Sequence, residues 1–305
     1  MHSLSDTNPL MSADELAARL ARVPGGPPVD GRGEPPVLLD VRWTLAGSDR
    51  EAYRRAHLPG AVFVDLDREL AGPPGAGGRH PLPDPADLQR VWRAAGIKDG
   101  SAVVAYDGGN GLAAARAWWL LRWSGLKSVQ VLDGGFPTWS AEPSRPVEDG
   151  DGHSPPPGSI TVVPGGMPVV EVDDAATLAT SGDGVLVDAR AAERFRGEVE
   201  PVDPVAGHIP GSVNLPVTGL LGPDGRYRPA DEIADAFASV GIAGSEHGAA
   251  QPPTAEPPTA AASCGSGVTA CQLILAGELA GVQLALYPGS YSQWCALGRP
   301  VATGG

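Results

Sequence analysis

The sequence repeats itself once, and this repeat limits the possible folds more than any other feature. Four landmarks of the first half recur in the second half in the same order and with nearly constant spacing. Four matches in one order are difficult to obtain by chance, so we interpret the chain as two copies of one fold. The paired stretches are VLLDVRW and VLVDARA (37–43 and 185–191), AHLPGAVFVDL and GHIPGSVNLPV (56–66 and 207–217), VVAYDGGNGLAAA and AASCGSGVTACQ (103–115 and 261–272), and VQVLDGGFPTW and LALYPGSYSQW (129–139 and 284–294).

Each copy alternates short apolar runs with helical patterns, which is typical of α/β folds with a mostly parallel sheet. The runs that end in Asp-x-Arg have the continuous apolar character of buried parallel strands. We therefore predict two tandem α/β domains, each a mostly parallel sheet flanked by helices. The sequence places them over 12–143 and 169–303, and the Pro- and Gly-rich stretch 144–168 is predicted to be a linker wrapped over the surface.

The sequence also predicts where the first helix of each copy starts, and it contains one insertion. Ser12 followed by Glu15 forms a capping-box pattern that predicts the first helix, and Asp173 is the expected start of its counterpart. The second copy is longer before its cysteine-containing loop. The extra residues lie in 244–262, which contains PPTA twice and is interpreted as a low-complexity insertion that weakens the following strand.

Length, charge and cysteine content exclude several classes of protein. The chain has 305 residues, enough for two ordinary domains, and its formal net charge of -14 disfavours nucleic acid and acidic membranes as partners. It contains no long apolar run that predicts a membrane span. Its first residues lack the pattern of a signal peptide, so we expect a cytoplasmic protein. Cys264, Cys271 and Cys295 have neither a disulfide framework nor zinc-ligand spacing, so no metal is expected.

The repeat separates architectural residues from candidates for chemistry. The Asp-x-Arg arginine and the histidine before Pro-Gly occur in both copies, which favours structural roles for them. The cysteine of the second copy, Cys264, instead matches Asp107 in the first, and Arg194 matches Ala46. Only the second copy therefore carries a thiol and an extra cation at these positions, as expected if that copy performs a reaction.

The loop that follows Cys264 suits a reactive thiol. It lies between a predicted strand and a predicted helix over 268–280, and ligands of α/β sheets bind beyond such carboxyl ends of strands. Gly265 and Gly267 allow backbone N–H groups to turn inward, and these groups together with the helix N-terminus favour a thiolate. Cys271 and Cys295 are interpreted as packing residues.

The motifs HLPGAVF, HIPGSVN, DARAAERFRG and CGSGVTA resemble those of the two-domain rhodanese-like sulfurtransferases. The resemblance covers about 12–303 and implies two rhodanese-like domains, the first catalytically inert and the second catalytic. The loop is most similar to the Cys-Gly-Ser-Gly-Val-Thr loop of the 3-mercaptopyruvate sulfurtransferases. Thiosulfate-preferring members usually carry Cys-Arg-Lys-Gly-Val-Thr, whose two cations suit a dianion.

The resemblance also implies a mechanism. Cys264 would take sulfur from 3-mercaptopyruvate as a persulfide and pass it to a thiol acceptor such as thioredoxin, or to cyanide, without a metal or organic cofactor. Arg194 would bind the donor carboxylate, and no second arginine follows Arg196 in the stretch before His-Ile-Pro-Gly. The catalytic candidates are Cys264 and a relay of Ser266, His57 and Asp49, and the substrate-binding candidates are Arg194, Gly265, Gly267, Val268 and Thr269.

Three alternatives remain open from the sequence. The first is a thiosulfate:cyanide sulfurtransferase with the same fold. The second is a cysteine phosphatase, which needs Cys, five residues and then Arg to clamp phosphate, whereas that position here is Ala270. The third is a sulfur-carrying or partner-binding module without turnover.

Overall fold

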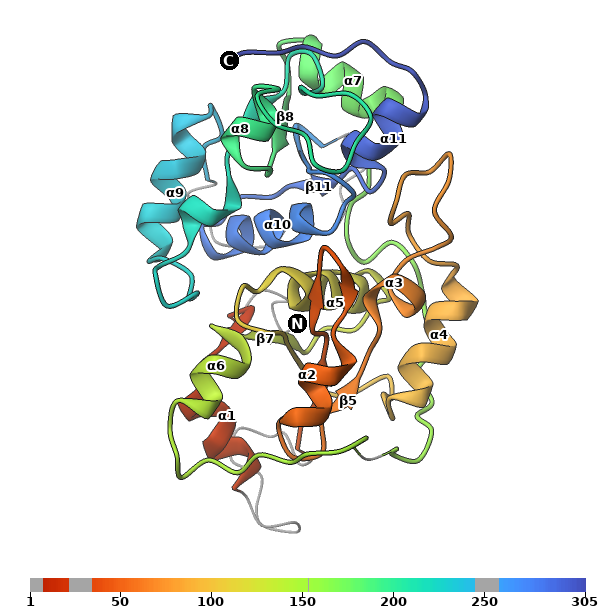
Figure 1. Ribbon diagram of the computed structural model, residues 1–305, viewed down its shortest axis with the longest axis vertical. Coiled ribbons are helices and arrows are strands. Elements are labelled where there is room, and N and C mark those ends of the chain that lie inside the picture. The colour runs from red at the N-terminus through yellow and green to blue at the C-terminus, as the bar shows by residue number, and fades with distance from the viewer. Residues whose placement is uncertain (1–7, 22–34, 153, 245–257) are drawn as a thin grey trace, which may run out of the picture. The chain divides into compact units, whose positions relative to one another are not determined.

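A computed structural model describes residues 8–21, 35–152, 154–244 and 258–305 (Figure 1). The described residues form two compact units. The N-terminal unit comprises 8–70 and 84–166, and the C-terminal unit comprises 71–83 and 167–305. Most of the insertion predicted at 244–262 lies outside the described residues.

The N-terminal unit is built on a parallel five-stranded sheet with the order β1-β7-β6-β2-β5. An antiparallel pair, β3 with β4, follows the central strand β2. The strands are β1 (Leu10–Met11), β2 (Val37–Asp40), β3 (Trp43–Thr44), β4 (Gly47–Ser48), β5 (Val62–Phe63), β6 (Val103–Tyr106) and β7 (Val129–Leu132).

The C-terminal unit repeats this order with β11-β10-β8-β9, again all parallel. A parallel bridge from Val169 to β11 takes the place of β1. The strands are β8 (Val185–Asp188), β9 (Val213–Asn214), β10 (Ala260–Ser263) and β11 (Ala285–Leu286). The predicted duplication of a mostly parallel sheet is confirmed, and β10 forms in full despite the insertion before it.

Helices flank the sheet of each unit. In the C-terminal unit α10 packs against α9, whereas α7 contacts α11 and the strands β8 and β10 (Figure 1). The helices of the N-terminal unit are α1 (Ala13–Leu20), α2 (Arg50–Arg55), α3 (Leu66–Glu69), α4 (Pro85–Ala94), α5 (Leu112–Trp123) and α6 (Gly135–Ser140). Those of the C-terminal unit are α7 (Val172–Thr180), α8 (Ala192–Phe195), the 3-10 helix η1 (Val217–Leu220), α9 (Ala230–Ser239), α10 (Thr269–Leu279) and α11 (Ser290–Ala296).

Local sequence explains where these helices start. Ser12 and Glu15 form the predicted capping box of α1. The counterpart helix α7 begins at Val172 with Glu171 as its cap, next to the predicted Asp173. The helices that follow the central strands, α5 and α10, are apolar around most of their circumference and are accordingly buried almost throughout. Burial of α10 fixes its N-terminus at the carboxyl end of β10.

The segment 71–83, here called the strap, belongs to the C-terminal unit although it lies in the first half of the sequence. The backbone N–H of Arg79 donates to Ser292 Oγ at 3.1 Å. Gly78 has φ +99°, and a Cβ there would lie 2.8 Å from the carbonyl oxygen of Gly289. Only glycine permits this conformation at so close an approach, so Gly78 allows the strap to pack against the start of α11.

Most of the predicted linker, 144–168, belongs to the N-terminal unit. Glu148 forms an antiparallel bridge with His57, and the N–H of Ile160 donates to the carbonyl of Ile97 at 3.1 Å. Residues 144–152 and 154–166 therefore pack on the rest of the N-terminal unit, to which they belong. The predicted boundaries of the two copies remain a prediction, and the compact units differ from them in the placement of the strap.

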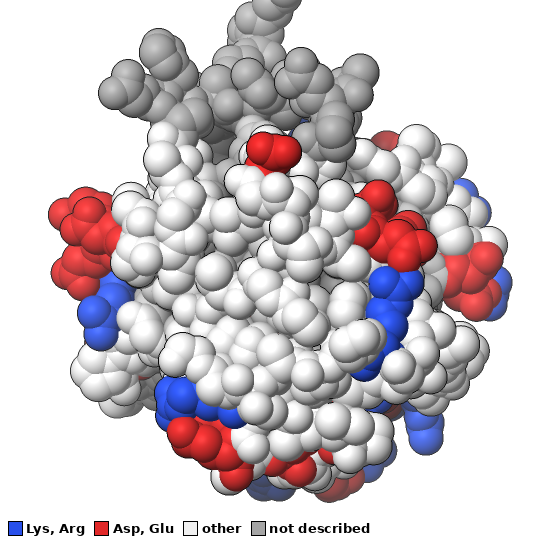
Figure 2. Space-filling view, turned by 90° about the horizontal axis from the view of Figure 1, so that it is seen from above, with Lys and Arg blue, Asp and Glu red and all other residues white. Residues whose placement is uncertain are grey.

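Charges on the molecule are mixed. On the face shown in Figure 2, basic side chains lie next to acidic ones and form no continuous basic surface. This pattern agrees with the formal net charge of -14 and offers no electrostatic footprint for a nucleic acid on that face. Within the described ranges, none of the helices has the length and apolar character needed to cross a membrane.

Candidate active site

Cys264 lies directly after β10, and the loop 265–268 connects it to α10. Cys264 is buried, with 2% of its surface exposed. The sulfur accepts the N–H of Gly267 at 3.1 Å, and the N–H of Cys264 donates to Ser290 Oγ at 3.1 Å. The sulfur is thus buried against a polar backbone group at the N-terminus of a buried helix, an environment that favours negative charge.

Glycine at position 267 makes this contact possible. Gly267 has φ +80°, and a Cβ at this residue would lie 2.3 Å from the carbonyl oxygen of Pro288. The tight turn directs its N–H toward the sulfur of Cys264. Any side chain would require the loop or the Pro288 backbone to move, so the shape of the loop depends on this glycine.

Ser290 supports the loop from the start of α11. Its φ of 50° lies in the left-handed region that residues with a side chain rarely occupy. Its hydroxyl donates to the carbonyl of Tyr287 at 2.9 Å while accepting the N–H of Cys264. The N–H of Tyr291 also donates to the carbonyl of Cys264 at 3.0 Å. Strained residues held by such contacts are common at functional sites.

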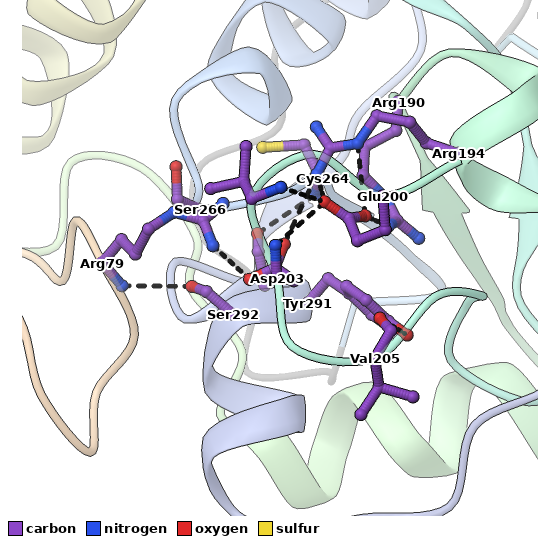
Figure 3. A network of polar contacts seen from close by, with 12 residues as sticks. Arg79, Arg190, Arg194, Glu200, Asp203, Val205, Cys264, Ser266, Tyr291 and Ser292 are labelled. Carbon is purple, nitrogen blue, oxygen red and sulfur yellow. Dashed lines mark hydrogen bonds and ion pairs between the residues drawn. The ribbon is translucent and has the colours of Figure 1, made fainter. Parts of the chain in front are cut away.

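Two arginines reach the loop and are held by two buried carboxylates (Figure 3). Arg194, in α8, pairs with Glu200 at 2.6 Å and with Asp203 at 3.4 Å. Arg79, in the strap, pairs with the same Asp203. The Glu200 and Asp203 side chains are only 3% and 2% exposed, so they serve as fixed anchors for the two guanidinium groups.

Glu200 is ionised in this setting. Burial opposes its ionisation, but the hydrogen bonds from Arg194 and from the N–H groups of Asp203 and Val202 lower its pKa below the usual value. Both backbone N–H groups lie 3.0 Å from Glu200 Oε1. The acidic anchor therefore stays charged near neutral pH and holds the Arg194 guanidinium in place.

Arg190 completes the cluster. It pairs with Asp188 at 2.7 Å and with Glu200 at 3.4 Å, and its guanidinium lies 4.1 Å from the centroid of the Tyr291 ring. In the N-terminal unit Arg42 pairs with Asp40 at 3.1 Å and stacks on an aromatic ring in the same way. The matching contacts agree with the structural role that the repeat predicts for the Asp-x-Arg arginines.

Ser266 has a histidine partner beside the cysteine loop. Its hydroxyl lies 2.8 Å from Nδ1 of His80, a residue of the strap. A hydroxyl and an imidazole at this distance can transfer a proton. The sequence prediction named His57 and Asp49 as the partners of Ser266.

His57 and Asp49 lie in the N-terminal unit, where each has a local partner. His57 Nδ1 lies 2.9 Å from the carbonyl of Tyr53, and Asp49 caps α2 by accepting the N–H of Ala52 at 2.9 Å. The matching His208 binds the carbonyl of Phe195 in the same way, at 2.7 Å. These repeated contacts fit a structural role for the histidines, and the relay role of His57 and Asp49 remains a prediction.

The other predicted site residues lie in the loop after Cys264 and at the start of α10. Val268 is buried and is the N-cap of α10, and Thr269 is the first residue of that helix. Gly265 faces the arginines, since a Cβ on it would lie 3.0 Å from Arg79 and 3.6 Å from Arg194.

Sequence reasoning missed four residues of the site: Arg79, His80, Glu200 and Asp203. Arg79 and His80 are adjacent in a Gly- and Pro-rich stretch between two helices, a context that by itself points to no function. Nothing in that stretch indicates that it packs on the second copy. The part of the chain that the structure describes contains no group of three His, Cys, Asp or Glu side chains arranged to hold a metal.

Both copies of the chain match a known protein family. The profile of the rhodanese-like domain matches residues 28–142 and 171–297, so each copy carries one match. The chain belongs to the rhodanese-like domain family.

Several relatives of this family extend over nearly the whole chain. A probable 3-mercaptopyruvate sulfurtransferase of Pseudomonas aeruginosa is 44% identical over 97% of this chain and 98% of its own length. A putative thiosulfate sulfurtransferase of Mycobacterium tuberculosis is 41% identical over 89% of this chain and 92% of its own. The crystal structure of the 3-mercaptopyruvate sulfotransferase SseA from Escherichia coli superimposes with a TM-score of 0.74 at 30% identity, covering 94% of this chain and 100% of that one.

Proposed function

We propose that the chain is a 3-mercaptopyruvate sulfurtransferase that works through a persulfide on Cys264. The observation that carries the proposal is the position of the Cys264 sulfur, which accepts the N–H of Gly267 at 3.1 Å at the start of a buried helix. An arginine pair lies at the neighbouring residue, Gly265. Relatives named as 3-mercaptopyruvate sulfurtransferases, which match over most of their length, support the same assignment. The N-terminal copy supplies no reacting group in this scheme.

The first half-reaction transfers sulfur to the enzyme. The thiolate of Cys264 attacks the thiol sulfur of mercaptopyruvate, so that an S–S bond forms and the C–S bond of the donor breaks. The electron pair of that bond leaves with the three-carbon fragment as the enolate of pyruvate, which then takes up a proton. The donor has one carboxylate, and Arg194 binds it with a charge-assisted contact.

Loop groups stabilise the charges that develop in this step. The N–H of Gly267 and the N-terminus of α10 stabilise the thiolate before transfer and the persulfide after it. Ser266 and His80 form the proton-transfer pair next to the ketone end of the donor, where enolate charge develops. We assign to His80 the place in the relay that the sequence predicted for His57.

The second half-reaction removes the outer sulfur. A thiol acceptor such as thioredoxin, or cyanide in an assay, attacks that sulfur and restores the thiolate of Cys264. Acceptor thiols are plentiful in the reducing cytoplasm, where we place the enzyme. All three cysteines are free, as this compartment favours.

Thiosulfate is the second candidate donor, since one relative is named for it. The loop residues Gly265 and Ser266 add no cation beside the sulfur, and Arg79 and Arg194 are already paired with carboxylates. This charge balance favours the monocarboxylate donor over a dianion. We therefore expect kcat/KM to be higher with mercaptopyruvate than with thiosulfate in a side-by-side assay.

The test of the proposal is a cysteine substitution with a matched control. Cys264→Ser is expected to lower pyruvate release from mercaptopyruvate by at least about a thousandfold, because serine cannot form a persulfide. Cys295→Ser, at a half-buried cysteine of the same unit, is expected to retain activity. A Cys264→Ser protein that releases pyruvate at the wild-type rate contradicts the proposal. A wild-type persulfide that forms but passes its sulfur to no acceptor identifies a carrier instead of an enzyme.

A further inference from the structure

Arg194, the proposed ligand of the donor carboxylate, has a second arginine beside it. The guanidinium of Arg79 shares the carboxylate of Asp203 with it, so that one acidic side chain bridges two cations (Figure 3). The Asp203 side chain is 2% exposed, whereas those of Arg79 and Arg194 are 31% and 17% exposed. The anchor is therefore buried, and the two cations face outward from it.

The guanidinium atoms nearest the loop have no protein partner among the described residues. Arg79 uses Nη1 for Asp203, and Arg194 uses Nε and Nη2 for Glu200 and Asp203. A Cβ on Gly265 would lie 3.0 Å from Nη2 of Arg79 and 3.6 Å from Nη1 of Arg194. These two unpaired donor groups thus converge on the residue that follows Cys264.

The strap holds Arg79 in this position through the same turn that supports the cysteine. The N–H of Arg79 binds Ser292 Oγ, and Ser292 donates its own N–H to the carbonyl of Gly265 at 2.9 Å. Two residues earlier, Ser290 binds the N–H of Cys264. Arg79 is therefore tied to the cysteine loop by a short chain of hydrogen bonds.

We propose that Arg79 is a second donor-binding residue, which together with Arg194 binds the carboxylate of the 2-oxo acid thiol, and that Asp203 positions both. This inference rests on the proposed function. Two guanidinium groups that each offer an N–H to one carboxylate fix its orientation as well as its charge. Residues 197–207 contain no arginine, so the strap supplies the second cation from a distant part of the sequence.

The experiment compares two donors that differ only in the carboxylate. Mercaptoacetone has the thiol and ketone of mercaptopyruvate but a methyl group where the donor acid has its carboxylate. Arg79→Gln is expected to lower kcat/KM for mercaptopyruvate by about 10- to 100-fold, mainly through KM, because one charge-assisted contact is lost. Its kcat/KM for mercaptoacetone is expected to stay within about twofold of wild type, since no contact to that donor is lost.

Matched variants separate binding from structure. Arg79→Lys keeps the charge and is expected to recover part of the loss. Arg196→Gln removes an exposed arginine of the same unit, paired with Glu198, and is expected to behave as wild type with both donors.

The outcomes are distinguishable from failure of the proposed function. An unchanged KM for mercaptopyruvate in Arg79→Gln, or an equal loss with both donors, overturns the role of Arg79 while leaving the enzyme a mercaptopyruvate sulfurtransferase. If the wild-type protein releases no pyruvate from mercaptopyruvate, the proposed function fails and the inference fails with it.

Discussion

The two copies use the same strand-loop-helix turn for different purposes. In the N-terminal unit the turn carries Asp107, whose carboxylate accepts the N–H groups of Gly109 and Gly111 through Oδ1 and those of Ala113 and Ala114 through Oδ2. These contacts span 2.9 to 3.2 Å. In the C-terminal unit the matching residue is Cys264, and its sulfur accepts the N–H of Gly267.

In both copies the turn directs backbone N–H groups toward the side chain that follows the central strand. One copy fills it with the carboxylate of Asp107 from its own chain. The other places there a thiol, a side chain that can act as a nucleophile. Replacing a carboxylate with a thiol converts a structural anion into a nucleophile while the backbone stays similar.

A second difference lies around the turn. Both copies keep a buried Asp-x-Arg pair, Asp40 with Arg42 and Asp188 with Arg190. Among the described residues, the C-terminal unit alone adds Arg194 and its acidic anchors, and Arg79 comes from the strap of the same unit. The C-terminal copy therefore combines the shared scaffold with a thiol and two arginines that are held by buried carboxylates.

The largest expected effect concerns the turn of the N-terminal unit, which the side chain of Asp107 occupies. Asp107→Ala removes an acceptor from four N–H groups, three of them in buried hydrogen bonds, and we expect it to lower the free energy of unfolding by about 4 kcal/mol. Chemical denaturation measures this loss. The kcat of the folded protein is expected to stay within about twofold of wild type, because Asp107 contacts no reacting group. A stable Asp107→Ala protein with greatly reduced kcat would break the comparison.

The next largest effect is the pH dependence of stability that Asp40 of the N-terminal unit contributes. Burial raises the pKa of the Asp40 carboxyl to about 6, against the attraction of Arg42. Because the folded pKa is raised, the proton stabilises the folded state below about pH 4, and this contribution, about 3 kcal/mol, is lost as the pH rises through 6.

The Asp40 prediction is measured by comparing the pH dependence of unfolding in wild type and Asp40→Asn. The variant lacks the titrating group, so the difference between the two curves is expected to change between about pH 4 and 6. Two parallel curves over that interval would show that Asp40 titrates alike in the folded and unfolded chains.

The reactive turn itself is tested by Gly267→Ala. A methyl group there meets the Pro288 carbonyl at 2.3 Å at φ +80°, so the N–H is displaced from the Cys264 sulfur. We expect kcat/KM for mercaptopyruvate to fall by about a hundredfold, or about 2.7 kcal/mol. Gly219→Ala is the control, since a Cβ at Gly219 meets no atom within 4 Å. Wild-type kcat/KM in Gly267→Ala is incompatible with a role for this N–H.

The smallest expected effect is a change in donor preference. Asp203→Asn removes one negative charge from between Arg79 and Arg194 and leaves the site more positive. The ratio of kcat/KM for thiosulfate to that for mercaptopyruvate is expected to rise about tenfold, or about 1.4 kcal/mol, because a dianion gains more from the added charge. The ratio cancels general losses of activity, so a constant ratio argues against electrostatic control by Asp203.

The sequence predicted the duplicated fold, the strand before Cys264 and the helix after it. It did so because these features depend on apolar runs and glycine turns that lie close together in the chain. Arg79 and His80 could not be predicted, since their role depends on packing of the strap against a loop far away in the sequence. The burial of Asp203 and Glu200 could not be predicted for another reason. Acidic residues in an irregular loop usually face solvent, so nothing in the sequence marks these two as buried anchors.

The most direct test of the central claim is to locate the transferred sulfur. The wild-type protein is treated with mercaptopyruvate without an acceptor, digested, and its cysteine peptides are weighed by mass spectrometry. We predict one added sulfur atom on the peptide that contains Cys264, none on those with Cys271 or Cys295, and loss of that sulfur on addition of cyanide. Pyruvate release with an unmodified Cys264, or with the sulfur on another cysteine, would contradict it.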